Sequence, residues 1–266
     1  MICVLGDAHL DVVVTISGPI APDTDTAART RVTPGGQAAN VAAWVAALGG
    51  RSRLIAARAA DAAGRLVATD LAERGVDLVG PVVAGNTGVV VSLSDGGSLR
   101  SMLTDRGVGP LLTAAAIDRG WLDGCSWLHL PAYSLTSEPV QAAALTAADA
   151  ARRSGARLSV DLSSTAAIVG YGAAALAGLL NRLGPTIVFG TKAESDLIGD
   201  VPGATMITKL GADGVLITGK RFAAIGTKPA DATGAGDAFA AGYLVGGVDL
   251  GLAAAARAVA TIGAMP

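Results

Sequence analysis

A turn of small residues followed by a carboxylate (residues 231–243) is the segment with the clearest chemical meaning. Gly234, Ala235 and Gly236 open an expected helix, and the next residue is Asp237. Unpaired amide N–H groups at a helix start bind anionic oxygens, and glycine lets a phosphate approach the backbone. Since a carboxylate repels phosphate, Asp237 is better explained as a general base that accepts the proton of an attacking hydroxyl. The alternative is an acid that only complements the helix dipole.

A second glycine-opened helix is expected near the start of the chain, over residues 36–48. Gln37 and Asn40 stand three residues apart and are therefore neighbours on one face of its first turn. Asn40 has both donors and an acceptor, so it can hydrogen-bond two hydroxyls of a polyol. The alternative is a polar residue that merely tolerates a helix start.

Two nucleotide motifs are only superficially matched. Gly214 to Lys220 has the spacing of a phosphate-binding P-loop, but Arg221 stands where a Mg²⁺-binding Ser or Thr belongs, so this segment is expected to be a strand and a hairpin turn. Phe239 occupies the third glycine position of a dinucleotide fingerprint, which disfavours an oxidoreductase.

The elements that must position these residues follow a βαβ rhythm. Such alternation is typical of an α/β fold with a mostly parallel sheet covered on both faces. The expected strands are 2–5, 54–57, 127–130, 158–161, 187–189 and 206–210, and the expected helices are 38–48, 65–74, 140–152 and 235–245. Two segments break the rhythm. Residues 86–104 are expected to form a hairpin around the turn Ser94–Gly97, and residues 11–34 can pair with it as a small accessory sheet.

Composition excludes several classes of protein. The chain has 266 residues, 51% of them hydrophobic, and a net charge of −2, so it can bury a large core but lacks the basic surface that binds nucleic acid or anionic membranes. Polar residues and glycines inside the apolar stretch 162–181 favour a loop and helix over a membrane span. The first apolar run ends at Asp7, short of a signal-peptide core, and the two cysteines are expected as buried thiols, so a cytoplasmic protein is expected.

Both glycine-opened segments resemble the two signatures of the PfkB, or ribokinase-like, carbohydrate kinase family. The first is residues 35–42 (GGQAANVA) and the second is residues 231–239 (DATGAGDAF). Similar landmarks occur along nearly the whole chain, at residues 6–11, 61–64, 75–77, 86–88 and 208–214. The resemblance implies one kinase domain over residues 1–266, with a three-layer α/β/α core and a small β lid formed by segments 11–34 and 86–104.

The same resemblance implies ATP-dependent phosphorylation of a sugar or nucleoside hydroxyl. Asp237 would be the catalytic base, and Gly234, Ala235 and Gly236 would supply the anion hole. The residues implied to hold substrate hydroxyls are Asp11, Gly35, Gly36 and Asn40. Those implied along the nucleotide are Thr191, Thr208, Gly211 and Gly214. Glu194 would organise Mg²⁺ through water, and Asp231 and Thr233 would lie near a monovalent cation such as K⁺.

Departures from the family pattern leave alternatives open. Thr191 replaces the Asn of the family's Asn-x-x-Glu motif, and the segment between Lys220 and Asp231 is short, so nucleotide preference is open. Arg100 can meet an acidic substrate or be a solvated hairpin charge. The low aromatic content of 3% favours a sugar over a nucleoside such as adenosine or pseudouridine. A catalytically silent sugar-binding regulatory relative is the other alternative. An apolar lid face would favour a homodimer through the lid.

Overall fold

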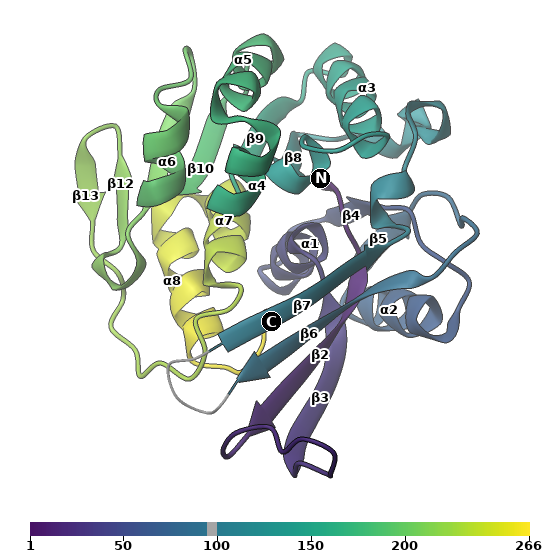
Figure 1. Cartoon of the computed structure of the whole chain (residues 1–266). Helices are drawn as coiled ribbons and strands as arrows, with labels where there is room; N and C mark the ends of the chain where they lie inside the picture. Colours follow the sequence, from purple (N-terminus) through teal and green to yellow (C-terminus); the bar gives the residue numbers. More distant parts are fainter. Residues whose placement is uncertain (95–99) are drawn as a thin grey trace.

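A computed structural model of the chain describes residues 1–94 and 100–266, with Arg100 described without its side chain. At its centre lies a nine-stranded sheet whose described strands all run in the same direction except the second from one edge, which is antiparallel to both of its neighbours (Figure 1). In spatial order the strands are β13 (Lys220–Phe222), β12 (Val215–Ile217), β11 (Thr205–Lys209), β10 (Ile187–Thr191), β9 (Arg157–Asp161), β8 (Trp127–Pro131), β1 (Ile2–Leu5), β4 (Ser52–Ile55) and β5 (Val76–Val79).

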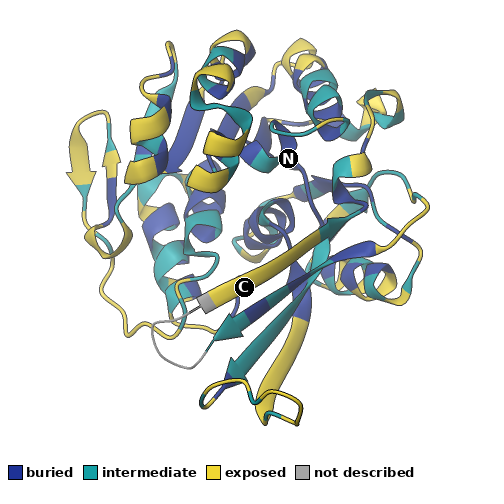
Figure 2. Ribbon diagram, in the orientation of Figure 1, coloured by how far each residue is buried: buried dark blue, intermediate teal, exposed yellow. Residues whose placement is uncertain are grey.

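Helices cover both faces of this sheet. One face packs α3 (Val140–Arg153), α4 (Thr165–Tyr171), α5 (Ala173–Leu183) and α6 (Lys192–Ile198). The other packs α1 (Gln37–Ala47), α2 (Ala62–Glu73), α7 (Ala235–Gly246) and α8 (Val248–Val259). The central strands of the sheet, from β10 to β4, are mostly buried between these helices, whereas β13 at one edge is largely exposed (Figure 2). The expected three-layer α/β/α core is confirmed.

The accessory segments form a second sheet, which we call the lid. Its spatial order is β3 (Ala28–Gly35), β2 (His9–Ile16), β6 (Thr87–Ser94) and β7 (Arg100–Gly107). β2 pairs antiparallel with β3 and parallel with β6, so the two segments that break the βαβ rhythm join side by side. The expected turn at Ser94–Gly97 and the side chain of Arg100 lie outside the described residues.

Three further expectations can be compared with the described residues. Residues 214–222 form the β12–β13 hairpin, as expected, and both cysteines are buried free thiols. In the described part of the chain, no single helix has the length and apolarity to cross a membrane. Helices α4 and α5 meet that criterion only as a pair, bent by 94°.

The parallel strands bring polar residues to one edge of the sheet. Because carboxyl ends of parallel strands lie at the same edge, Asp161, Thr191 and Lys209 come together as the last residues of β9, β10 and β11. The first turn of α7 lies at this edge, because a Cβ on Gly236 would stand 3.1 Å from Nζ of Lys209, and Asn40 in the first turn of α1 contacts Asp237 in the same turn of α7. Ligands of open α/β sheets bind at such an edge, which makes it the candidate site.

Candidate active site

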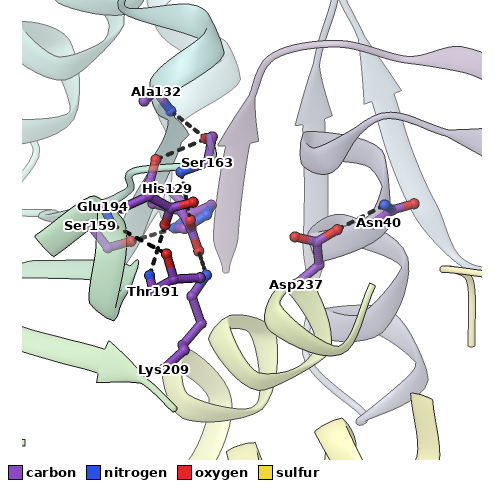
Figure 3. A network of polar contacts seen from close by, with 10 residues as sticks. Asn40, His129, Ala132, Ser159, Ser163, Thr191, Glu194, Lys209 and Asp237 are labelled. Carbon is purple, nitrogen blue, oxygen red and sulfur yellow. Dashed lines mark hydrogen bonds and ion pairs between the residues drawn. The ribbon is translucent and has the colours of Figure 1, made fainter. Parts of the chain in front are cut away.

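The two glycine-opened helices meet at their first turns. Asn40 of α1 donates a hydrogen bond from Nδ2 to Oδ2 of Asp237 on α7, over 2.8 Å (Figure 3). Gly36 has φ 99°, and a Cβ there would lie 2.5 Å from the Asp7 carbonyl oxygen, so only glycine fits before α1. Gly234, with φ 73°, gives α7 the same kind of start. Two segments that the sequence marks separately therefore form one site.

The environment of Asp237 makes its carboxylate a base. Burial raises the pKa of Asp237 from 3.8 to about 7, with a further rise from the charge of Asp161. Hydrogen bonds from Asn40 and Gln37 and the charge of Lys209 act in the opposite direction. A general base works best when its pKa lies near the operating pH. Asp237 therefore has the pKa that proton abstraction from a hydroxyl requires, rather than that of a solvated helix-start acid.

The lid brings a second set of polar groups to this junction. Asp11 of β2 lies against Gly35, where a Cβ would stand only 2.2 Å from its carboxylate, and Nε2 of His9 lies 3.0 Å from its Oδ1. The buried atoms without a hydrogen-bond partner among the described residues include His9 Nδ1, Gln37 Oε1 and Asn40 Oδ1 at this junction. Buried polar atoms without hydrogen-bond partners are rare in native proteins, so these three side chains are suited to bind a polar ligand.

The expected substrate residues, Asp11, Gly35, Gly36 and Asn40, thus lie together at the junction of the lid and α1. His9 joins them, although its type alone did not single it out. It stands two residues before Asp11 on the same strand, and residues i and i+2 of a strand share a face. That spacing was the available signal.

A cavity of about 620 Å³ adjoins the first turn of α7. Gly236 and Ala235 form one wall, and the rest is mostly small or apolar. The lining includes Thr191, Gly211 and Gly214, but Thr208 is absent from it and its neighbour Lys209 is present. Three of the four expected nucleotide residues therefore meet at this cavity, and Lys209 takes the place expected of Thr208.

Lys209 and Asp161 form a buried ion pair beside the cavity that sequence reasoning missed. Nζ of Lys209 lies 2.7 Å from Oδ2 of Asp161, across the end of β10. Burial acts to lower the pKa of Lys209, but the carboxylates of Asp161, Asp237 and Glu194 outweigh it and raise the pKa. The lysine is therefore a fixed positive charge.

Comparison with known proteins agrees with this geometry. The family model described as pfkB family carbohydrate kinase matches residues 1–265. The chain belongs to the PfkB family. A fructokinase of Escherichia coli is 29% identical over 271 residues, covering 94% of this chain and 85% of that protein. An ATP-dependent ribose-1-phosphate kinase of Halopiger xanaduensis is 31% identical over 255 residues, covering 92% and 84%.

Solved structures confirm the ribokinase-like fold. An adenosine kinase from Sinorhizobium meliloti superimposes with a TM-score of 0.87 at 22% identity, covering 100% of this chain and 95% of that chain. An Escherichia coli structure described as a ribokinase II in complex with ATP and Mg²⁺ gives 0.85 at 21%, covering 99% and 94%. The expected family and fold are confirmed, and the protein is a PfkB phosphotransferase that acts on a sugar or nucleoside hydroxyl.

The PfkB motif that contains Thr191 and Glu194 is a helix capping box in this chain. Thr191 Oγ1 accepts the N–H of Glu194 at 3.3 Å, and Glu194 Oε2 accepts the N–H of Thr191 at 2.7 Å. Ser, Thr, Asp and Asn all serve at this helix position, so Thr preserves the local backbone. The substitution leaves Glu194 buried at the sheet edge.

These residues fit a PfkB kinase's Mg²⁺. Only one oxygen of Glu194 is used by the capping box, so the other can hold a metal-bound water. Among the described residues there is no cluster of three or more His, Cys, Asp or Glu side chains suited to a metal. Mg²⁺ usually keeps several waters and binds through one or two carboxylates plus substrate phosphates, so a single carboxylate suffices.

Asp231 and Thr233 brace the loop before Gly234. Asp231 Oδ1 accepts the N–H of Thr233 at 2.9 Å and its hydroxyl, and Asp231 Oδ2 accepts the N–H of Gly263 at 3.0 Å. These bonds tie the loop before α7 to the segment after α8. The structure thus gives the two residues a role in positioning the loop.

Proposed function

We propose that this PfkB kinase transfers the terminal phosphoryl group of Mg·ATP to a hydroxyl of a small neutral sugar, with Asp237 as general base. The observation that carries the proposal is the position of Asp237. It follows the loop Gly234–Gly236 directly, contacts Asn40, and has a pKa raised to about 7 by burial. It therefore stands where the lid-side polar groups and the cavity meet.

The chain's own residues supply the functions that phosphoryl transfer needs. Asp237 accepts the hydroxyl proton as the new bond to phosphorus forms, while amides of Gly234, Ala235 and Gly236 hold the transferred oxygens. Mg²⁺ would neutralise charge on the phosphates, with Glu194 holding one of its waters. Closure of the lid over the substrate would exclude water and limit ATP hydrolysis. No covalent nucleophile is required.

Two observations support a neutral sugar as the substrate. The unpartnered acceptors Gln37 Oε1 and Asn40 Oδ1 call for donors, which sugar hydroxyls provide and phosphate oxygens do not. Asp11 lies against Gly35 and Asp237 against Asn40, so a carboxyl group borders each side of the start of α1 and disfavours an anionic substrate there. The names of relatives range from fructokinase to ribose-1-phosphate kinase and adenosine kinase, so a nucleoside or a sugar phosphate is the alternative.

ATP as donor is supported by the cavity and by the ATP and Mg²⁺ complex of the related ribokinase II. Small residues along the wall, including Gly211 and Gly214, leave room for a nucleotide. The monovalent-cation site expected near Asp231 and Thr233 stays a prediction. It is tested by comparing turnover in potassium and in tetramethylammonium salts.

A homodimer through the lid is supported by the lid's outer face. Register places Val32, Val12, Val91 and Leu103 in one row across all four strands, on the side opposite Asp11. Val32 and Leu103 are 48% and 60% exposed. An apolar row of this kind is typical of an interface.

The dimer test uses residues on opposite faces of β7. Leu103→Glu should give a monomer by light scattering at micromolar concentration. Met102→Glu, on the other face at 55% exposure, should leave the dimer intact. A wild-type monomer contradicts the dimer.

As further expectations, we place the protein in the cytoplasm, with no nucleic-acid or membrane partner.

The activity test measures ADP release from Mg·ATP over a panel of pentoses, hexoses, sugar acids, sugar phosphates and nucleosides. Asp237→Asn, purified in the same way, controls for contaminating kinases. We expect turnover with one neutral sugar class that is absent from the variant. Turnover with a nucleoside or a sugar phosphate alone contradicts the proposed substrate. Turnover that persists in the variant contradicts Asp237 as the base.

A further inference from the structure

The ion pair between Lys209 and Asp161 lies beside the phosphate end of the cavity, and the mechanism above does not use it. Their side chains are 15% and 1% exposed. Asp161 Oδ1 also accepts the backbone N–H of Ser163 at 3.0 Å, so the carboxylate is fixed from two sides. Burying such a pair is costly in free energy and stabilises a fold weakly, if at all. A role in chemistry would account for it.

Lys209 points toward the anion hole. A Cβ placed on Gly236 would stand 3.1 Å from Nζ of Lys209, so the ammonium lies directly against the first turn of α7. Among the described residues that line the cavity, Lys209 alone carries a formal charge. The neighbouring amides of α7 already present partial positive charge. The ammonium adds a full charge at the same place.

The donor count of the ammonium leaves it free to bind a phosphate. A lysine ammonium has three N–H donors, and the bond to Asp161 uses one of them. In the described part of the chain no other hydrogen-bond partner of Nζ occurs. Asp161 can therefore keep hold of Nζ while Nζ contacts a second acceptor.

We propose that Lys209 is a further catalytic residue, whose ammonium hydrogen-bonds a non-bridging oxygen of the transferred phosphoryl group, and that Asp161 is its positioning residue. This inference rests on the proposed function. The substrate hydroxyl oxygen forms the new bond to phosphorus, its proton passes to Asp237, and the bond to the leaving ADP breaks. Lys209 keeps all its protons throughout and stabilises the negative charge on the phosphoryl oxygens in the transition state.

The test compares nucleotides that differ in the terminal phosphoryl group. Lys209→Met removes the charge at similar length. We expect its affinity for the non-hydrolysable analogue β,γ-imido-ATP with Mg²⁺ to fall at least tenfold by calorimetry, while its affinity for ADP changes less than threefold. Its kcat with the sugar that the activity panel identifies should fall about 100-fold, as for loss of one oxyanion-hole donor. Equal losses for both nucleotides, or none, overturn the proposal.

Two further variants separate catalysis from folding. Lys209→Met leaves Asp161 buried without its partner, so Asp161→Asn/Lys209→Met removes both charges together. If this double variant melts as a folded protein but keeps wild-type kcat, the pair is structural and the proposal fails. Lys192→Met is the matched control, because it breaks an exposed 2.8 Å pair with Asp196 and should change nothing. The calorimetric comparison needs no sugar, so it stands even if the proposed substrate is wrong.

Discussion

Replacing Asp237 by Asn should lower activity and raise stability at the same time. The shape of the side chain and its acceptor toward Asn40 are kept, while the ability to take a proton is lost. Loss of a general base typically costs 10²–10⁴-fold, so we expect kcat to fall by about 100-fold or more with ligand binding retained. The same change removes a carboxylate that burial makes unfavourable.

The stability gain follows from the pKa of Asp237. A carboxyl whose pKa rises on folding from 3.8 to about 7 contributes stability that is present below pH 3.8 and is lost as the pH rises to 7. The full linkage is about 4 kcal/mol at pH 8. Since Asp237 is partly exposed, solvent screening reduces it, and we expect about 1–2 kcal/mol. For a chain of this size that is a rise in Tm of about 2–6 °C.

Thermal melts of the unliganded proteins at pH 8 and pH 5 measure this gain. At pH 5 the carboxyl is mostly protonated in the folded state, so the difference in Tm should shrink to about a third. Asp249→Asn is the matched control, because Asp249 is an exposed acid in the first turn of α8 and should raise neither value. A variant with wild-type kcat refutes the assignment of the base. A Tm that falls, or a gain independent of pH, refutes the reasoning from burial.

Three further outcomes are expected. The kcat/KM of the wild type should rise about tenfold per pH unit and level off above an apparent pKa of about 7, and a flat profile from pH 5.5 to 8 contradicts this. Asn40→Ala removes a hydrogen bond that lowers the pKa of Asp237, so the same profile should shift to higher pH; an unshifted profile argues against the coupling. Glu194→Gln keeps the capping box but weakens the hold on a metal-bound water, so the Mg²⁺ concentration for half-maximal ADP release should rise about tenfold or more, and an unchanged value removes Glu194 from the metal site.

The fold could be predicted because its signals are local. Runs of three to five largely apolar residues between Ala-rich helical stretches indicate a parallel sheet without any knowledge of contacts. The starts of α1 and α7 could also be predicted, because glycine directly precedes each helix: α1 follows strand β3, and α7 follows the loop 223–234. Residues 214–220 have the spacing of a P-loop but form the β12–β13 hairpin, because residues with high strand propensity occupy the positions between its glycines.

Contacts between residues that are distant in sequence could not be predicted from such local signals. Asn40 and Asp237 are 197 positions apart, and only the packing of α1 against α7 brings them into contact. Alternation along β11 says that Thr208 and Lys209 face opposite ways, but it does not say which of them faces the cavity. That choice is made by the helices on each face of the sheet. The expectation for Thr208 rested on its position in the motif alone, and the residue of β11 that lines the cavity is Lys209.

The charges around the cavity explain why one lysine carries so much of the proposed chemistry. Asp161, Glu194 and Asp237 place three carboxyl groups near one ammonium, and their charges raise the pKa of Lys209 against the effect of burial. Burial, together with the charge of Asp161, raises the pKa of Asp237 to about 7. If Lys209 were neutral, that pKa would rise further and the base would be protonated when substrate arrives, so the lysine supports the proton transfer as well as the phosphoryl transfer.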